Sequence, residues 1–335
     1  MPDAVGQRPA LGSERAVAGA AIGSAGFAVP EKIVENAPIA ERLGVEPEWI
    51  VRRTGISRRH VLAPGERLID IAAQAGDAAL AGAELDPGDV DLVLVATTSN
   101  DHITPDAAPL VAAELGARRA GAFDVGAACT GFVAAVAVAR GQIETGMAER
   151  VLVIGADALF QYLDSDDKRT AALFGDGAGA VVMTATDPPG RVGAPVLRAD
   201  GGRANLIFAT RDEAKLQMEG GETFRHAVER LAEVTEEALA SAGIGTGDID
   251  LFVYHQANRR ILRAVGERLE LPPERVVDVI AEYANTSAAT IPIALAKVQA
   301  EGTLTPGQRL LLAAFGAGFT WGAMVIDWGL DEQYV

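Results

Sequence analysis

The single cysteine of this 335-residue chain, Cys129, lies within Asp-Val-Gly-Ala-Ala-Cys-Thr-Gly-Phe at residues 124–132. The glycines allow a tight turn and a close approach by a substrate, and an apolar segment with helical character follows directly. A cysteine at the start of a helix feels unpaired amides and the positive end of the helix dipole, which favour the thiolate. A lone cysteine is otherwise most often a small core residue. The surroundings of Cys129 favour a nucleophile.

Two other polar residues have chemistry that would complement this thiol. His255 ends an apolar run in Tyr-His-Gln-Ala-Asn, and Asn285 precedes another in Ala-Asn-Thr-Ser-Ala-Ala. A neutral imidazole and a carboxamide can both donate hydrogen bonds to an enolate oxygen, while the amide of Cys129 can bind a thioester oxyanion. The alternatives are a satisfied core histidine and a helix cap. Together the three residues predict carbon–carbon bond formation through an acyl-enzyme.

An internal repeat explains how residues so far apart in sequence could meet. The residues at 79–82, 88–92 and 150–152 resemble those at 238–241, 247–251 and 309–311, always 159 positions later. At this offset Cys129 corresponds to position 288, three residues past Asn285. Loops at equivalent places in two packed halves converge on their pseudo-twofold axis. We therefore expect a flexible N-terminal arm at 1–18, a half with the nucleophile at 19–187, and a half with His255 and Asn285 at 188–335.

The two halves show the same order of predicted elements. Each has an amphipathic helix, then a Gly/Asp turn and an apolar strand, then an apolar helix and two further buried strands. The helices are expected at 68–85, 222–242, 130–146 and 287–302, and the strands at 92–96, 251–254, 150–154, 180–183, 309–313 and 323–326. Strands that are apolar without alternation indicate sheets covered on both faces. The fold class is therefore α/β in layers.

Composition and charge exclude several classes of protein. A net charge of −17 without a dominant basic stripe argues against nucleic acid as a partner. The first fifteen or so residues lack the apolar core of a signal peptide, and no apolar run reaches membrane-spanning length. One cysteine excludes an internal disulfide, and four scattered histidines have no metal-ligand spacing. We expect a cytoplasmic enzyme without a metal, a cofactor or a membrane partner.

From about residue 20 to residue 328 the chain resembles a β-ketoacyl-acyl carrier protein synthase III of the thiolase superfamily. The resemblance implies a five-layer αβαβα fold built from two duplicated halves, and a homodimer. It rests on six motifs in a specific order: Glu48-Trp49-Ile50-Val51 through Arg53-Thr54-Gly55-Ile56; Ala127-Ala128-Cys129 with Gly131-Phe132; Phe174-Gly175-Asp176-Gly177-Ala178-Gly179-Ala180; His255-Gln256-Ala257-Asn258; Asn285-Thr286-Ser287-Ala288-Ala289; and Phe315 through Gly318-Phe319-Thr320-Trp321-Gly322.

The resemblance also implies a mechanism with acyl-CoA as a substrate rather than a cofactor. Cys129 would take the acyl group, and a malonyl group on acyl carrier protein would then lose CO₂ while His255 and Asn285 hold the enolate. The amides of Cys129 and Ala317 match the oxyanion hole of the family, and Phe315 matches an aromatic residue beside the decarboxylation site.

Further roles follow from the resemblance at the mouth of the site. Trp49 matches the residue that stacks on the CoA adenine, Arg53 one near its phosphates, and Asn258 a pocket asparagine. Residues 175–179 lack the spacing of a dinucleotide fingerprint, so we expect them to shape the backbone near the active site. The basic residues Arg225, Arg260 and Arg263 match a docking surface for the acidic carrier protein; the alternative is an ordinary solvated helix face.

Several departures from the family bear on the substrate. Thr104 stands where several bacterial members carry a phenylalanine that crosses the dimer and shortens the acyl pocket, so a longer or branched starter could fit here. Residues 209–219 form a shorter stretch than in housekeeping members, Tyr283-Ala284 replaces His-Gly, and Lys168 takes an arginine position near the adenine. These changes suggest a member from specialised metabolism, with selection of a starter unit in fatty acid or polyketide biosynthesis as its role.

Two other functions stay open at this point. An acyltransferase of the same fold could move the acyl group from Cys129 to a hydroxyl or amine without condensation. A non-catalytic subunit could bind only the carrier protein or a sister synthase. The retained Asn285 argues against the first alternative, because enolate chemistry alone needs that second donor. The complete set of cysteine, histidine and asparagine argues against the second.

Overall fold

The apolar runs of the N-terminal half form a five-stranded sheet in the computed structural model, which describes residues 18–330. The predicted N-terminal arm therefore lies outside the described residues, apart from residue 18. The strand order is β1 (Gly19–Ala28), β7 (Asp176–Thr186), β6 (Arg150–Ala158), β4 (Leu92–Ala96) and β5 (Gly121–Val125). Strand β4 is parallel to both of its neighbours, and β1 and β7 are antiparallel. All five residues of β4 are buried, as expected for a sheet covered on both faces.

The C-terminal half forms a four-stranded sheet on the same plan. Its order is β11 (Leu251–Tyr254), β12 (Arg309–Gly316), β13 (Thr320–Asp327) and β8 (Val196–Ala199). Strands β11 and β12 are parallel, and the other pairs are antiparallel. Both β4 and β11 begin and end where the apolar runs predict.

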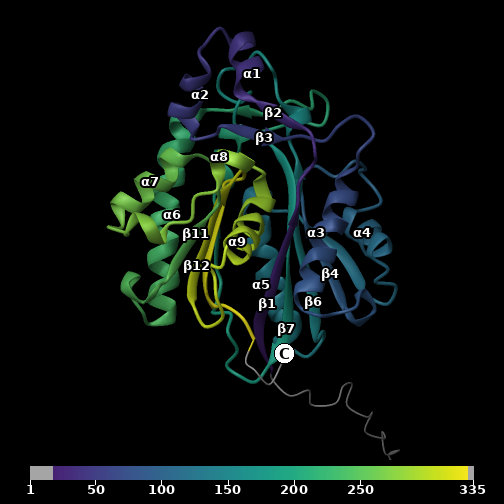
Figure 1. Cartoon of the computed structure of the whole chain (residues 1–335). Helices are drawn as coiled ribbons and strands as arrows, with labels where there is room; N and C mark the ends of the chain where they lie inside the picture. Colours follow the sequence, from purple (N-terminus) through teal and green to yellow (C-terminus); the bar gives the residue numbers. More distant parts are fainter. Residues whose placement is uncertain (1–17, 331–335) are drawn as a thin grey trace, which may run out of the picture.

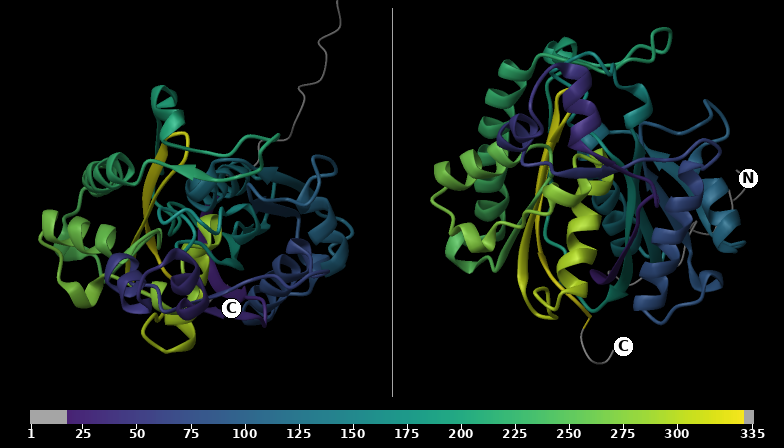
Figure 2. Two further views of the ribbon diagram at one scale, coloured as in Figure 1. Left: turned by 90° about the horizontal axis from the view of Figure 1, so that it is seen from above. Right: turned by 45° about the horizontal axis from the view of Figure 1, so that its top comes forward.

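Helices separate and cover the two sheets, which gives five layers (Figure 1). The apolar helices α5 (Gly131–Glu144) and α9 (Thr290–Ala300) lie between the sheets. The outer face of the first sheet carries α3 (Leu68–Gly82) and α4 (Ala107–Leu115), and that of the second carries α6 (Gly220–Ala242) and α7 (Arg259–Arg268). Figure 2 shows the same layers from above. The αβαβα fold from two duplicated halves is confirmed.

The offset of the sequence repeat reappears in the positions of the elements. The 3₁₀ turns η1 (Pro87–Asp89) and η2 (Ala128–Thr130) recur 159 positions later as η5 (Thr246–Asp248) and η7 (Ser287–Ala289). Helices α5 and α9, strands β4 and β11, and strands β6 and β12 begin at the same offset. Turn η2 packs against η7 at the centre of the molecule. The boundary between the halves near residue 187 stays a prediction.

Two features of the central layer differ from the sequence expectation. The predicted helix at 287–302 starts at Thr290, because Ser287 has a left-handed φ of 54° and the preceding residues form η7. The glycine-rich residues 175–179 mostly belong to strand β7. A Cβ on Gly179 would lie 2.6 Å from the backbone nitrogen of Ile293, so glycine lets α9 approach the sheet.

Shorter elements cover the end of the sheets at the top of Figure 1. They are β2 (Ile33–Glu35), α1 (Asn36–Leu43), α2 (Pro47–Thr54), β3 (Arg58–His60), η3 (Phe160–Tyr162), η4 (Gly201–Leu206), β9 (Ile207–Phe208), β10 (Gln217–Met218) and α8 (Ile280–Tyr283). The 3₁₀ turn η6 (Pro273–Arg275) lies at the opposite end, where Arg275 donates to the carbonyls of Gly247 and Ile249 before β11. The fully buried Arg59 donates to Asn36 Oδ1 at 2.8 Å and to the carbonyl of Ala172 at 3.0 Å, which fixes this layer. Among residues 18–330 no helix has the length and apolar character that a membrane span needs.

Candidate active site

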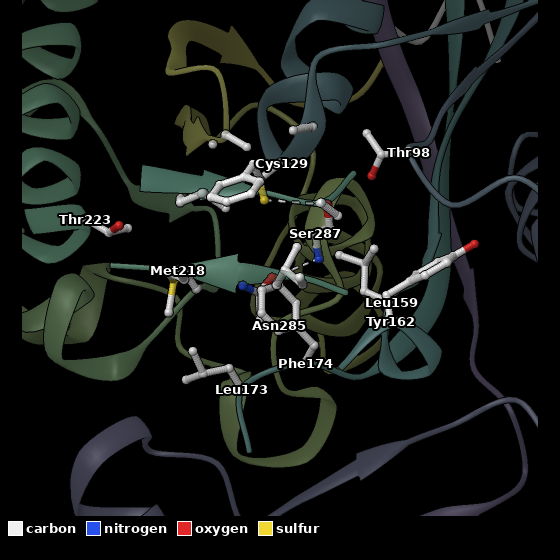
Figure 3. A pocket seen from close by; sticks show the side chains of 18 of the residues that line it. Thr98, Cys129, Leu159, Tyr162, Leu173, Phe174, Met218, Thr223, Asn285 and Ser287 are labelled. Carbon is white, nitrogen blue, oxygen red and sulfur yellow. Dashed lines mark hydrogen bonds between the residues drawn. The ribbon is translucent and has the colours of Figure 1, made fainter. Parts of the chain in front are cut away.

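A cavity of about 1190 Å³ opens between the two halves and contains the three residues that the sequence singled out. Cys129, His255 and Asn285 all line it, although they come from different loops. Figure 3 shows Cys129 and Asn285 facing the same space, with Ser287 between them. The structure thus brings together side chains that are 126 and 30 residues apart in the sequence.

Cys129 lies in η2, directly before helix α5, on a sharply turned backbone. The preceding Ala128 has a left-handed φ of 46°. The Oγ1 of Thr320, in the C-terminal half, donates to the carbonyl of Ala127 at 3.2 Å, and the Oγ1 of Thr130 donates to the carbonyl of Thr320 at 3.1 Å. These bonds hold the cysteine turn against strand β13. The two halves therefore position the thiol jointly.

Close packing behind the thiol depends on a glycine. A Cβ on Gly316 would lie 2.9 Å from the backbone nitrogen of Cys129 and 3.1 Å from its Cβ. Because no side chain is present, the next amide, that of Ala317, reaches the thiol. The amides of Cys129 and Ala317 lie near enough to the sulfur to lower the pKa of the thiol. Two amides beside a nucleophile can bind the oxyanion of the thioester that it attacks.

The ionisation of Cys129 differs from the sequence expectation. Burial raises the pKa of Cys129 to about 11, and the negative charge of Asp157 adds to the rise, while the Ser287 hydroxyl and the two amides lower it. The sulfur lies deep in the protein but keeps surface open to the cavity. The expected stabilisation by the helix dipole is therefore outweighed, and the free protein holds a thiol at neutral pH.

His255 follows strand β11 and is fixed at one ring nitrogen. Its backbone nitrogen donates to the carbonyl of Ala313 at 2.8 Å, which continues the pairing with β12. Its Nδ1 lies 2.6 Å from the Oγ1 of Thr290, so its other nitrogen, Nε2, remains for the cavity. Burial lowers the pKa of His255 to about 3. The ring is neutral at physiological pH.

A hydrogen bond fixes the orientation of the Asn285 carboxamide. Its Oδ1 accepts from the amide of Ser287 at 2.9 Å, which leaves the NH₂ group for the cavity. Its backbone is held by the segment around Phe174: Asn285 N donates to the Leu173 carbonyl at 3.0 Å, and Gly175 N donates to the Asn285 carbonyl at 3.1 Å. Asn285 therefore presents a donor.

The mouth of the cavity is lined by the residues for which the resemblance implied nucleotide contacts. Trp49, Arg53 and Lys168 line it, and the Arg53 guanidinium lies 4.9 Å from the centre of the Trp49 ring. Asn258 also lines the cavity, and its Oδ1 caps α7 by accepting from the amide of Arg260 at 2.9 Å. Further in, Phe315 is buried against Phe319 with ring centres 4.6 Å apart.

Three predicted site residues do not line this cavity. Thr104 is exposed and its neighbour Ile103 lines the cavity in its place. Arg225 and Arg263 are exposed outside it, whereas Arg260 lies at its edge with its guanidinium 5.3 Å from the centre of the Phe224 ring. The charge of Arg225 is matched by Glu222, at 2.6 Å, whereas Arg260 and Arg263 form no ion pair among residues 18–330.

The sequence analysis did not single out three polar residues around the thiol and imidazole. They are Ser287, Thr290 and Asp157, all buried. Ser287 lies inside the Asn285 motif, so its position near Asn285 could have been predicted. Asp157 could have been noticed because it is the single charged residue within the apolar run 151–160.

Comparisons with known protein families identify relatives of this chain. The family model "3-Oxoacyl-[acyl-carrier-protein (ACP)] synthase III" matches residues 123–201, and the model of its C-terminal part matches residues 239–328. A relative named "Beta-ketoacyl-[acyl-carrier-protein] synthase III 2", from Streptomyces coelicolor, is 47% identical over 94% of this chain and 96% of its own length. A synthase III from Cereibacter sphaeroides is 43% identical over 92% of this chain and 99% of its own.

Solved structures give the same result. The 3-oxoacyl-[acyl-carrier-protein] synthase III of Aquifex aeolicus superposes with a TM-score of 0.89 at 39% identity, covering 92% of this chain and 100% of its own. The priming β-ketosynthase of the R1128 polyketide pathway gives a TM-score of 0.91 at 32% identity, covering 96% of this chain and 99% of its own.

Proposed function

The chain belongs to the 3-oxoacyl-[acyl-carrier-protein] synthase III family of condensing acyltransferases in fatty acid or polyketide synthesis, and from this premise we propose that Cys129, His255 and Asn285 perform its chemistry. The observation that carries the proposal is that a thiol, with the amides of Cys129 and Ala317 beside it, shares one cavity with a carboxamide NH₂ and a neutral imidazole.

The first half-reaction loads the acyl group. The sulfur of Cys129 attacks the thioester carbonyl of acyl-CoA, and the amides of Cys129 and Ala317 hold the oxyanion that forms. Collapse of this intermediate releases CoA as the free thiol and leaves an acyl-cysteine. Trp49 and Arg53 at the mouth support CoA as the donor, because an indole ring can stack on adenine and a guanidinium can bind phosphate.

The second half-reaction makes the carbon–carbon bond. When the malonyl thioester loses CO₂, the charge moves onto its thioester oxygen, and the NH₂ of Asn285 and an N–H at Nε2 of His255 hold it. Thr290 Oγ1 lies 2.6 Å from Nδ1 and 3.1 Å from the Ser287 carbonyl, and when it donates its proton to Nδ1 the ring proton stays on Nε2. The enolate carbon then bonds to the acyl carbon, and the bond from that carbon to the sulfur breaks. Cys129 leaves as the thiolate and takes one proton from solvent, which restores the thiol.

The malonyl donor is an acyl carrier protein in this proposal. The exposed Arg260 and Arg263 lie on one side of α7 close to the cavity mouth, on a chain that is otherwise strongly acidic. An acidic carrier protein would be steered to this local positive charge. Arg225 contributes less, because Glu222 pairs with it.

We also propose that two copies form a homodimer through strand β5. This strand is the edge of the first sheet, and its Phe123 keeps 41% of its surface exposed. The adjoining loop exposes 80% of Ile103, which lines the cavity. An apolar edge strand is a template for pairing, and a second copy would cover both residues and complete the acyl side of the cavity. Placement in the cytoplasm stays a prediction.

Mass spectrometry of the whole protein tests the function. Incubation with a panel of acyl-CoAs of graded length and branching should add the acyl mass to Cys129, with long or branched chains accepted if Thr104 leaves the pocket deep. Addition of malonyl-acyl carrier protein should then remove that mass with release of CO₂. Acyl transfer to a hydroxyl or amine without CO₂ would favour the acyltransferase alternative, and absence of any loading would overturn the proposal.

A further inference from the structure

A buried carboxylate lies beside the nucleophile without a cation to pair with it. Asp157, at the end of strand β6, is completely buried, and no lysine, arginine or histidine of residues 18–330 forms an ion pair with it. Its Oδ1 accepts from the amide of Thr98 at 2.9 Å and from the Oγ of Ser99 at 2.7 Å. A buried charge without a counter-charge is costly, so its presence beside an active thiol needs an explanation.

The two carboxylate oxygens of Asp157 are not equivalent. Besides the bonds above, Oδ1 receives longer contacts from the hydroxyls of Thr97 at 3.3 Å and Thr98 at 3.2 Å, so its lone pairs are occupied. Oδ2 accepts from the amide of Ala288 at 3.1 Å and faces the η7 turn. Oδ2 is therefore the oxygen with capacity for a proton.

Ser287 connects this oxygen with the nucleophile. Its Oγ lies 3.5 Å from the sulfur of Cys129, as the dashed line in Figure 3 shows. On its other side the next residue, Ala288, donates its amide to Oδ2 of Asp157, and the Ser287 side chain is near enough to lower the pKa of that carboxyl. The left-handed backbone of Ser287 is fixed because its amide donates to the Oδ1 of Asn285. A hydroxyl can accept one proton while it donates another, so this serine can pass a proton between sulfur and carboxylate.

We propose that Asp157 accepts the proton of the Cys129 thiol through Ser287, and that this transfer generates the thiolate that attacks the acyl donor. The inference rests on the proposed function. The reason is charge conservation in a buried place: loss of the thiol proton to water would leave two buried negative charges, whereas transfer to Asp157 moves one charge from oxygen to sulfur and adds none. At the sulfur that charge meets the amides of Cys129 and Ala317.

The proton is conserved through acyl loading. The S–H bond of Cys129 breaks as its proton passes to the Oγ of Ser287, while the hydroxyl proton of Ser287 passes to Oδ2 of Asp157. The sulfur bonds to the acyl carbon, and the bond from that carbon to the CoA sulfur breaks. The departing CoA thiolate takes the proton back from Asp157 along the same path and leaves as the free thiol.

This assignment leaves His255 free for the second half-reaction. Burial lowers the pKa of His255 to about 3, so the imidazolium that it would form by accepting the thiol proton is strongly disfavoured. With Asp157 as the acceptor, His255 stays neutral throughout and keeps an N–H for the enolate. The two half-reactions then use separate groups.

The pH dependence of thiol alkylation tests the relay without any acyl substrate. Cys129 is the single cysteine, so iodoacetamide reports its thiolate directly. If the thiol and Asp157 share one proton, the thiolate fraction is independent of pH between the two apparent pKa values of the pair. The wild-type rate should therefore be level across neutral pH. A thiol that ionises to water gives a rate that rises about tenfold per pH unit over the same range.

Three variants sharpen the test. Asp157→Asn should replace the level region by the tenfold rise per pH unit, and Ser287→Ala should lower the level rate by roughly tenfold, since the sulfur loses a hydrogen-bond donor. Asp176→Asn is the matched control: Asp176 is another buried carboxylate, bonded to the amides of Phe160 and Leu62 and not to Ser287, and its variant should keep the level region.

The outcomes separate cleanly. A wild-type rate that already rises tenfold per pH unit, or an Asp157→Asn protein that reacts faster than wild type at neutral pH, would show that Asp157 acts on the thiol by charge alone and overturn the relay. If circular dichroism shows that Asp157→Asn does not fold, the Ser287→Ala variant decides instead. A pH-independent alkylation rate equal to that of wild type in Ser287→Ala would overturn the relay. An alkylation rate that is independent of pH, without acyl loading from acyl-CoA, would uphold the relay and reject the proposed function. Acyl loading with an alkylation rate that rises with pH would reject the relay and uphold the proposed function.

Discussion

Nδ1 of His255 lies 2.6 Å from Oγ1 of Thr290, and that hydroxyl is also 3.1 Å from the carbonyl of Ser287. The hydroxyl has one proton for two acceptors, so its direction decides which nitrogen of the neutral imidazole carries the ring proton. A proton given to Nδ1 places the N–H on Nε2, toward the cavity. Thr290 therefore controls whether His255 can act as a donor.

Thr290→Val should slow decarboxylation of the malonyl thioester by about tenfold or more, because Nδ1 loses its partner and the ring its fixed orientation. Acyl loading of Cys129 should change much less, and Thr290→Ser should restore the rate. The two half-reactions can be measured separately, by CO₂ release and by mass. With four histidines in the chain, ¹⁵N spectra can follow the tautomer of His255 directly. Equal loss in both half-reactions would contradict this role.

Asn285→Asp should abolish condensation while Cys129 still accepts an acyl group. The aspartate keeps the bond from the Ser287 amide but replaces the NH₂ donor by a second acceptor, which repels the enolate, and we expect a loss of about 10² to 10³ in rate. Asn36→Asp is the control, because Asn36 is also buried and its Oδ1 also accepts an N–H, from Arg59 at 2.8 Å, outside the cavity. Similar losses in both variants would contradict the role of Asn285 as an enolate donor.

Gly316→Ala should reduce both stability and acyl loading. The new Cβ would meet the backbone of Cys129 at 2.9 Å, so we expect about 1–3 kcal/mol lower unfolding free energy and a thiol displaced from the two amides. Gly141→Ala, in the helix that follows the cysteine turn, has open space around the new methyl and should be neutral or stabilising. The unfolding free energy in urea and the acyl-loading rate are to be compared between the two variants. Equal values for Gly316→Ala and Gly141→Ala would contradict the prediction.

Protonation of His255 should contribute to loss of stability in acid. The pKa of its ring is about 3 in the folded protein and about 6.5 in the unfolded chain, so the unfolded state binds the extra proton as the pH falls through this window. The contribution is complete above pH 6.5 and declines by about 2 kcal/mol between pH 6.5 and pH 5. His255→Gln should lack this decline in urea unfolding. Parallel curves for the two proteins would refute the prediction.

Charge reversal on α7 tests the docking surface. Arg260→Glu with Arg263→Glu should raise the KM for malonyl-acyl carrier protein by about tenfold at low salt, and less at high salt, because steering by charge is screened. Arg268→Glu, exposed on the same helix, is the control and should change KM little. Loading from acyl-CoA should be unaffected in the double variant, and a matching loss in Arg268→Glu would point to net charge rather than to a docking surface.

The sequence predicted those parts of the fold that local patterns determine. Strands β4 and β11 were predictable to the residue, because their continuous apolar runs stand between turn residues. Strand β5 was not, because its Gly-Ala-Phe-Asp-Val sequence is half exposed at a sheet edge and has no apolar run. The meeting of Cys129, His255 and Asn285 was predictable because the repeat fixes equivalent loops.

Properties of the site that arise from burial could not be predicted from the sequence. The rise in the pKa of Cys129 depends on how many atoms surround the sulfur and on the charge of Asp157, which lies 28 positions away in the chain. The contact between Ser287 and Cys129 depends in the same way on the packing of η2 against η7. Both the pKa of Cys129 and its contact with Ser287 are set by three-dimensional packing.

Thr320 and Gly316 belong to one duplicated half and Cys129 to the other, so the reactive thiol has no finished environment until the halves dock. A chain severed near residue 190 would therefore yield two inert fragments, each with part of the machinery. If the two fragments are mixed, thiol reactivity should return only as they bind each other. Neither duplicated half can therefore carry out the reaction alone.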